Sequence, residues 1–189
     1  IRSSGGEQRL RPYTEHLPKP MVPIVGTPII ERQISRLRAA NIKKIYISVN
    51  YLSNIIEDYF RDGADFGVQI SYLHETEKLG TGGSLSLLPD VAEKPILVMN
   101  GDVLSNIDYH AMGQFHQRHQ AKVSVAAVNH EITIPFGVVE ADGPYITGFT
   151  EKPVKRFFFF FGIYVLSPEL FVASLRDAPF NMTDIVEKF

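Results

Sequence analysis

The stretch GGEQRLRPYTEHLPKPMVP, residues 5–23, is the feature around which the rest of this chain is organised. It holds two adjacent glycines, four prolines and the basic side chains of Arg9, Arg11 and Lys19. Glycine lets a backbone approach a ligand closely, and guanidinium and ammonium groups bind phosphate. Proline stiffens the segment that carries Lys19, so this side chain loses less entropy on binding. The stretch is a candidate phosphate-binding segment, although a solvated basic loop with turn prolines has the same composition.

Length and composition place the chain among globular proteins and exclude several classes. The 189 residues suit a single domain, and 44% hydrophobic with 21% charged residues is ordinary for one. A net charge of −2 argues against a nucleic-acid partner, which would favour a basic surface. There is no cysteine and no apolar run near the roughly 20 residues that span a bilayer, so we expect a cytoplasmic protein without membrane contact. Both ends lack the usual boundary signals, and we expect a fragment truncated at both ends.

Apolar periodicity predicts alternating helices and strands up to residue 128. The expected helices cover residues 28–41, 53–60, 84–88 and 109–119, and the expected strands cover residues 44–49, 68–73, 96–99 and 122–128. Such βαβ units build an α/β fold with a Rossmann-like, mainly parallel sheet and helices on both faces. Ligands in these sheets bind beyond the carboxyl ends of the strands. The glycine-rich segment and the turn Asn100-Gly101-Asp102 are both expected at that edge.

The pattern changes after residue 128, where strands follow one another without helices between them. Strands are predicted over residues 136–140, 145–151 and 157–166, with turns such as Asp142-Gly143-Pro144, and a helix over 168–175. The last strand opens with five consecutive phenylalanines. This part predicts an antiparallel extension of the sheet within a single domain, residues 1–189. At the other end, residues 1–4 are too few and too polar to predict a strand.

Two carboxylates, Asp102 and Glu75, are candidate ligand-binding groups. Asp102 follows a very hydrophobic strand, and a carboxylate there suits Mg²⁺, which takes one or two carboxylates beside phosphate oxygens and water. A turn aspartate is the alternative, but the glycine-rich segment expected at the same edge favours the metal. Glu75 precedes the loop Gly80-Thr81-Gly82-Gly83. Its ionised oxygens only accept hydrogen bonds, so they match the adjacent N–H donors of guanine and not uracil or thymine; an exposed loop glutamate is the alternative.

The remaining polar residues leave one motif with two interpretations and argue against several classes of site. Glu151-Lys152-Pro153 fits a solvent-facing turn, or a carboxylate against sugar hydroxyls with an ammonium against a second phosphate. The histidines have no metal-ligand spacing that includes a glutamate base, and His116 and His119 are expected as partly buried or surface side chains. No Gly-x-Ser-x-Gly or Gly-x-x-x-x-Gly-Lys motif supports a hydrolase or a P-loop. A nicotinamide-dependent dehydrogenase is disfavoured because prolines follow the glycines.

In their order along the chain, these motifs resemble the sugar-1-phosphate nucleotidylyltransferases, also called NDP-sugar pyrophosphorylases. The matching motifs are Gly5-Gly6-Glu7-Gln8-Arg9-Leu10-Arg11-Pro12, Pro18-Lys19-Pro20-Met21, Gly26-Thr27-Pro28-Ile29, Leu79-Gly80-Thr81-Gly82-Gly83, Asn100-Gly101-Asp102, Phe136-Gly137-Val138-Val139, Glu151-Lys152-Pro153 and Gly162-Ile163-Tyr164. The Leu-Gly-Thr-Gly-Gly form is similar to the mannose- and heptose-1-phosphate guanylyltransferases. This agrees with Glu75, because thymidylyl- and uridylyltransferases typically carry glutamine at that place.

The resemblance implies a role for each matching residue. The nucleotide contacts would come from Gly5, Gly6, Glu75, Gly80 and Thr81. The catalytic residues would be Arg9, Lys19 and Asp102, with Asp102 as the Mg²⁺ ligand. The sugar phosphate would be held by Gly137, Glu151 and Lys152. Residues 1–128 would then form the nucleotide-binding half, and residues 129–189 the sugar-phosphate-binding half.

The implied reaction transfers a nucleoside monophosphate from an NTP, with GTP favoured, to a sugar 1-phosphate, and it releases pyrophosphate. The partners are these two small molecules, with neither nucleic acid nor membrane, and a homo-oligomer is compatible with the resemblance. A non-catalytic relative that binds sugar nucleotides is the alternative, because two residues separate Gly6 from Arg9 where the family has three. The family's second metal-binding aspartate would fall beyond the last residue of this chain.

Overall fold

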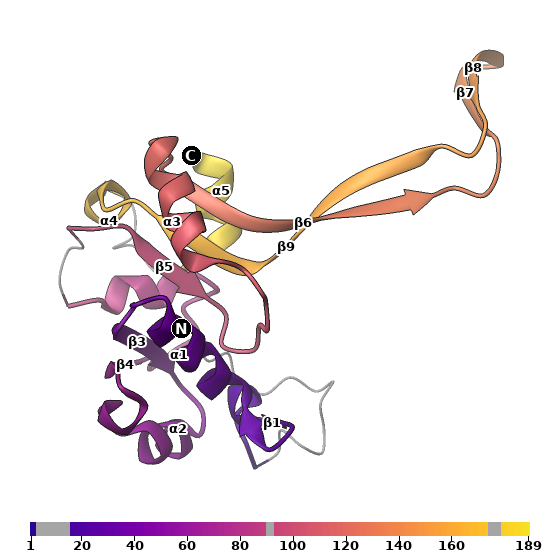
Figure 1. Ribbon diagram of the computed structural model, residues 1–189. Helices are drawn as coiled ribbons and strands as arrows, with labels where there is room; N and C mark the ends of the chain where they lie inside the picture. The colour runs from indigo at the N-terminus through magenta and orange to yellow at the C-terminus, as the bar shows by residue number, and fades with distance from the viewer. Residues whose placement is uncertain (3–15, 90–92, 174–178) are drawn as a thin grey trace. The chain divides into compact units, whose positions relative to one another are not determined.

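A computed structural model describes residues 1–2, 16–89, 93–173 and 179–189 (Figure 1). The elements in these ranges are η2 (Lys19–Met21), β1 (Pro23–Ile24), β2 (Thr27–Pro28), α1 (Ile29–Ala39), β3 (Lys44–Val49), α2 (Ser53–Phe60), η3 (Ala64–Phe66), β4 (Gln69–His74), η4 (Gly83–Leu87), β5 (Ile96–Met99), α3 (Tyr109–Arg118), β6 (Val123–Thr133), β7 (Val138–Asp142), β8 (Tyr145–Thr150), β9 (Val154–Leu166), α4 (Glu169–Ala173) and α5 (Met182–Lys188). None of the helices described here is both long enough and apolar enough to cross a bilayer.

The predicted helices and strands form close to their expected positions, with two differences up to residue 128. The helix expected over 84–88 is the 3-10 helix η4, because this short segment closes with i to i+3 hydrogen bonds such as Leu88 N to Leu85 O. The strand expected over 122–128 continues to Thr133, because β9 lies beside it. The first difference concerns the type of helix, and the second concerns how far the strand extends.

Ile1 and Arg2 join the neighbouring strands into one sheet. β3 pairs in parallel with β4, and β9 lies between β5 and β6. The amide of Ser48 on β3 donates to Ile1 O at 2.9 Å, and the amide of Arg2 donates to Met99 O on β5 at 2.9 Å. Arg2 thereby forms parallel β-bridges with Ser48 on one side and with Asn100 on the other. The strand order is β4, β3, residues 1–2, β5, β9, β6, so a segment too polar to be predicted as a strand lies in the middle of the sheet.

Both faces of this sheet are buried, as the alternation along β9 demonstrates. Ile163 and Val165 pack in one hydrophobic cluster with α1, α2 and α3, whereas Tyr164 and Leu166 pack in a second cluster with α4 and α5. Successive residues of a strand point to opposite faces, so helices cover both sides of the sheet. β5 runs antiparallel to β9, while β3, β4 and residues 1–2 share the direction of β5. The predicted α/β class is confirmed, and the sheet is mixed, with β3 and β4 parallel and β5 and β9 antiparallel.

Residues 127–161 form a compact unit of their own, separate from the unit of residues 1–126 and 162–189. In this smaller unit β7 and β8 form an antiparallel hairpin, and Gly143 in its turn has a φ of +58°, which glycine adopts without strain. The five phenylalanines at 157–161 lie on β9 and have exposed fractions from 43% to 74%. The strands predicted for this part are confirmed, but β7 and β8 form a two-stranded sheet of their own instead of extending the central sheet as expected. The separate binding roles of residues 1–128 and 129–189 stay predictions.

His116 on α3 ties three segments of the larger unit together. Its side chain is 2% exposed, with Nδ1 2.8 Å from Ser124 Oγ and Nε2 2.9 Å from Ser167 Oγ. Ser167 Oγ donates its proton to Ala121 O at 2.8 Å, so Nε2 donates to Ser167 and Nδ1 accepts from Ser124. His116 is therefore a buried neutral side chain and not the partly buried or surface residue expected, because two serines satisfy both ring nitrogens.

Burial lowers the pKa of His116 below its usual value of 6.5. Below about pH 6.5 the unfolded chain binds a proton that the folded protein does not bind. We therefore expect the free energy of unfolding to decrease as the pH is lowered below this value, by at most about 1.4 kcal/mol per pH unit. Urea denaturation at several pH values measures this decline. The decline should be shallower in His116→Gln and unchanged in the exposed control His119→Gln; equal slopes in all three proteins would contradict the role of His116.

Candidate functional site

The candidate site lies at one edge of the central sheet. β3, β4, β5 and residues 1–2 run parallel, so they all end at this edge. Glu75 follows β4, and the turn Asn100-Gly101-Asp102 follows β5, which places both predicted groups at the same edge. Gly5, Gly6 and Arg9 lie outside the described residues, and their roles stay predictions.

Lys19 and Asp102, both predicted to be catalytic, form an ion pair. Lys19 Nζ lies 2.5 Å from Asp102 Oδ2, and the two side chains are only 18% and 19% exposed. Lys19 opens the 3-10 helix η2 directly after Pro18, and the amide of Met21 donates to Pro18 O at 2.8 Å. The low exposure of both groups strengthens their attraction relative to an ion pair on the surface. The structure therefore joins two residues that are far apart in sequence into one charged pair.

The turn that carries Asp102 is held from two sides. The amide of Gly101 donates to Arg2 O at 2.7 Å, and a Cβ at position 101 would lie 2.7 Å from that oxygen, so the close approach requires glycine. From α1, Gln33 Nε2 donates to Asn100 O at 2.9 Å and to Val103 O at 2.7 Å. Gln33, which is 1% exposed, was not predicted from the sequence. Its position could have indicated a buried polar contact, because Gln33 is a polar residue within the apolar stripe of α1.

Asp102 is a suitable ligand for a magnesium ion. Within the described ranges, no three histidine, aspartate or glutamate side chains cluster as a complete metal site. Mg²⁺ does not require such a cluster, because it keeps several waters and binds through one or two carboxylates together with substrate phosphates. One partly exposed carboxylate beside a lysine fits that donor set.

Glu75 is held in place by β3, the neighbour of its own strand. Its amide donates to Val49 O at 2.9 Å, and the hydroxyl of Ser48 donates to Glu75 Oε1. Oε2 has no hydrogen-bond partner in the part of the chain that the structure describes. One carboxylate oxygen is therefore fixed by the protein, and the other is free to accept from a ligand. Contact with a base stays a prediction.

The predicted base-binding residues Gly80 and Thr81 are fastened to the start of α5. Gly80 has a φ of +80°, and a Cβ there would lie 2.5 Å from Phe180 O, so only glycine fits. The amide of Thr81 donates to Asn181 Oδ1 at 3.1 Å, and Thr81 Oγ1 accepts from the amide of Met182 at 2.8 Å. These contacts give the loop a structural role, and its contact with a nucleotide stays a prediction.

The three predicted sugar-phosphate residues belong to the smaller unit, residues 127–161. Gly137 precedes β7, and Glu151 and Lys152 follow β8, so the antiparallel pairing brings them to the open end of one hairpin. A Cβ at Gly137 would lie 3.1 Å from Glu151 Oε2 and 2.6 Å from the ring of Phe149. Glu151 and Lys152 are exposed. The structure thus groups these residues, and their binding of a sugar phosphate stays a prediction.

Known proteins match this chain along nearly its whole length. The family described as nucleotidyl transferase matches residues 2–188. A mannose-1-phosphate guanyltransferase of Kluyveromyces lactis is 36% identical over 183 residues, which cover 90% of this chain and 50% of that protein. A mannose-1-phosphate guanylyltransferase of Mycobacterium tuberculosis is 35% identical over 150 residues, which cover 78% of this chain and 42% of that protein. The chain spans about half the length of the curated relatives it matches.

A solved structure shares the fold. HddC from Yersinia pseudotuberculosis aligns over 100% of this chain and 84% of its own, with a TM-score of 0.70 and 24% sequence identity. The structure of HddC complexed with GMP-PN aligns with a TM-score of 0.67 and 23% identity. At these identities, the likeness establishes the fold alone.

Proposed function

This chain belongs to the nucleotidyl transferase family, and on that premise we propose that it transfers GMP from GTP to a sugar 1-phosphate and releases pyrophosphate. The observation that carries the proposal is the Lys19–Asp102 ion pair at the edge of the sheet. The choice of substrates is supported by relatives named mannose-1-phosphate guanyltransferase and by the HddC complex with GMP-PN. We place the reaction in the cytoplasm, since a sequence without cysteine suits a reducing compartment.

The proposed chemistry is an in-line displacement at phosphorus. An oxygen of the sugar phosphate forms a bond to the α-phosphorus of GTP, and the bond from that phosphorus to the bridging oxygen of pyrophosphate breaks. The attacking oxygen is already an anion, so no strong general base is needed. The protein then acts by positioning the two substrates and by stabilising negative charge.

Lys19 is the described residue best suited to stabilise that charge. In the structure its ammonium is paired with Asp102, and the pair is mostly shielded from water. An ammonium group has three donors, so Lys19 can bind a phosphate oxygen and still contact Asp102. Asp102 would hold Mg²⁺, which would supply further positive charge to the phosphate oxygens. Arg9, Gly5 and Gly6 are proposed to bind the triphosphate.

Glu75 is proposed to select guanine through the oxygen that Ser48 leaves free. We expect Glu75→Gln to lower kcat/KM for GTP by about 10- to 100-fold, because a hydrogen bond to a charged group contributes about 1.5–3 kcal/mol. The relative use of UTP and dTTP should rise. Pyrophosphate release with each NTP measures both effects. Glu77→Gln, an exposed glutamate in the same loop, is the control; if it alters GTP use as much as Glu75→Gln does, Glu75 has no special role.

The remaining predicted contacts complete the proposal. Gly80 and Thr81 would present the loop before η4 to the nucleotide. Gly137, Glu151 and Lys152 would bind the sugar phosphate, which assigns that substrate to residues 129–189 and the nucleotide to residues 1–128. The exposed carboxylate of Glu151 suits sugar hydroxyls, and the ammonium of Lys152 suits a phosphate.

A direct assay tests the proposed function. Purified protein is incubated with Mg²⁺, with each NTP in turn and with a panel of sugar 1-phosphates that begins with mannose 1-phosphate. We expect pyrophosphate to be released, fastest with GTP. Nucleotide binding without pyrophosphate release from any pair would refute the enzymatic role and indicate a non-catalytic relative that binds sugar nucleotides.

A further inference from the structure

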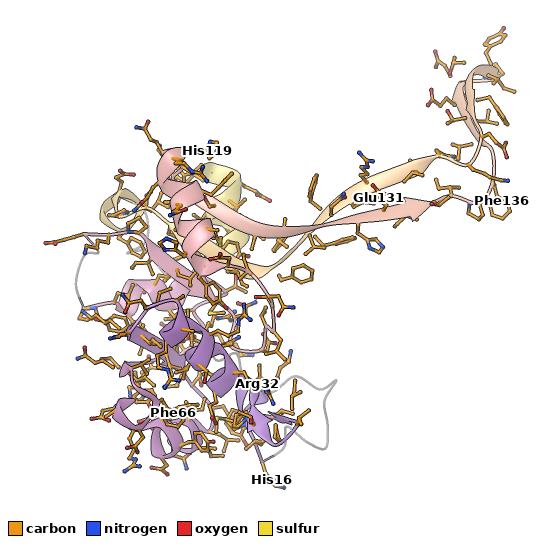
Figure 2. The ribbon with its side chains drawn as sticks, viewed as in Figure 1. His16, Arg32, Phe66, His119, Glu131 and Phe136 are labelled. Atoms are coloured by element: carbon orange, nitrogen blue, oxygen red, sulfur yellow. The ribbon has the colours of Figure 1, made fainter. Side chains whose placement is uncertain are left out.

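A cavity lined in part by polar side chains lies beside α1 and is not used by the proposed reaction. Its volume is about 650 Å³, within the range of small-molecule sites. Its polar lining comes from β2, from α1 and from the chain that follows Asp102, and consists of Thr27, Arg32, Ser35, Arg36, Ser105 and Asn106. Figure 2 labels Arg32 among these side chains. All these residues belong to the larger unit.

The cavity is positively charged. Arg32 and Arg36 are four residues apart on α1, so their side chains share one face of the helix. The lining contains no acidic residue. The nearest acid in sequence, Glu31, instead accepts a hydrogen bond from the hydroxyl of Tyr59 at 2.7 Å. The two guanidinium groups therefore have no carboxylate partner among the residues that form this cavity.

Several donors of the cavity are also unpaired. Arg32 Nη2 donates to Ile24 O at 2.6 Å, and Arg36 Nη2 donates to Ile107 O at 2.9 Å. The Nε atoms of both arginines and the Oγ of Ser105 are buried without a hydrogen-bond partner among the described residues. A buried donor without an acceptor is unfavourable, and native proteins rarely leave one so. Three such groups at one cavity indicate a missing acceptor.

We propose that this cavity binds the phosphate group of a small anionic metabolite, at a site separate from the Lys19–Asp102 pair. A phosphate has several strong acceptor oxygens, and guanidinium groups match it with paired N–H donors. The hydroxyls of Thr27, Ser35 and Ser105 add neutral donors around the same space. The cavity volume leaves room for the rest of a metabolite beside its phosphate.

Protection from chemical modification tests the proposal in the unaltered protein. Phenylglyoxal modifies accessible arginines, and mass spectrometry measures the rate at each one. Inorganic phosphate at about ten times its Kd should slow modification of Arg32 and Arg36 by about tenfold, because the free fraction falls to about one tenth. Arg38, which contacts Phe66 O on the exposed side of the same helix, is the internal control and should react at an unchanged rate. Chloride at equal ionic strength controls for screening.

Two variants separate this site from the proposed active site. Lys19→Ala should keep the protection of Arg32 and Arg36. In calorimetric titration with inorganic phosphate, the double variant Arg32→Gln and Arg36→Gln should lose this binding, with an affinity at least about tenfold weaker, whereas Arg38→Gln should match the wild type. Unprotected arginines in the wild type, protection lost in Lys19→Ala, or unchanged affinity in the double variant would each overturn the proposal.

Discussion

Lys19→Ala is expected to lower kcat by about 10²–10³-fold, the usual effect of removing one charge-stabilising donor from an active site. Lys19 Nζ lies 2.5 Å from Asp102 Oδ2, so the variant removes a cation at the point where phosphate charge would develop. The fold should survive, because the carboxylate left behind is 19% exposed and keeps contact with water. Pyrophosphate release measures the rate, and thermal unfolding measures the stability.

Two comparisons make the result for Lys19 specific. Lys43→Ala removes an exposed lysine before β3 and should leave the rate unchanged. Lys19→Arg should recover only part of the activity, because a planar guanidinium does not replace a compact ammonium. Turnover close to the wild-type rate in Lys19→Ala would remove Lys19 from the proposed mechanism.

Asp102→Asn is expected to cause a loss of similar size, about 10²–10³-fold in kcat, and to raise the Mg²⁺ concentration needed for half-maximal rate. The substitution keeps the size of the side chain and removes its charge, so it tests the carboxylate and not the packing of the turn. The backbone contacts of Gly101 with Arg2 and of Gln33 with Asn100 remain available to hold that turn. Rates across a Mg²⁺ series give both quantities.

The matched control for Asp102 is Asp142→Asn, which alters an exposed aspartate at the end of β7. It should leave both the rate and the Mg²⁺ dependence unchanged. If Asp102→Asn loses activity without a change in Mg²⁺ dependence, Asp102 acts only by positioning Lys19 and the proposed metal ligand is wrong.

Patterns that are local in the sequence predicted the elements of this fold well. The positions of α1, β3, α2, β5 and α3 followed from apolar periodicity, because a helix or strand must place its apolar residues on the buried side. The rule that ligands bind at the carboxyl ends of strands placed the Asn100-Gly101-Asp102 turn correctly. The structure adds Glu75 to that edge, because this residue follows β4; its role as a base contact came from hydrogen-bond chemistry and stays a prediction.

Long-range contacts were beyond these patterns. Ile1 and Arg2 lie in the middle of the sheet because β3 and β5 supply hydrogen bonds on both sides, which compensates for their polarity and small number. Gln33 and His116 are buried because distant backbone carbonyls pair with the amide nitrogen of Gln33 and two serines pair with both ring nitrogens of His116. The residues next to Gln33 and His116 in the sequence do not indicate which distant groups will pair with them.

The sequence by itself determined the class of fold, the edge of the sheet at which a ligand would bind and the type of chemistry that its charged residues suit. These features depend on periodicity and on the side chains themselves, which are local. Only the tertiary structure decided that Lys19 pairs with Asp102 and that Thr81 binds the start of α5, 100 residues away. The reason is physical: these residues meet only because the order of strands in the sheet brings them together, and that order results from the packing of the whole chain.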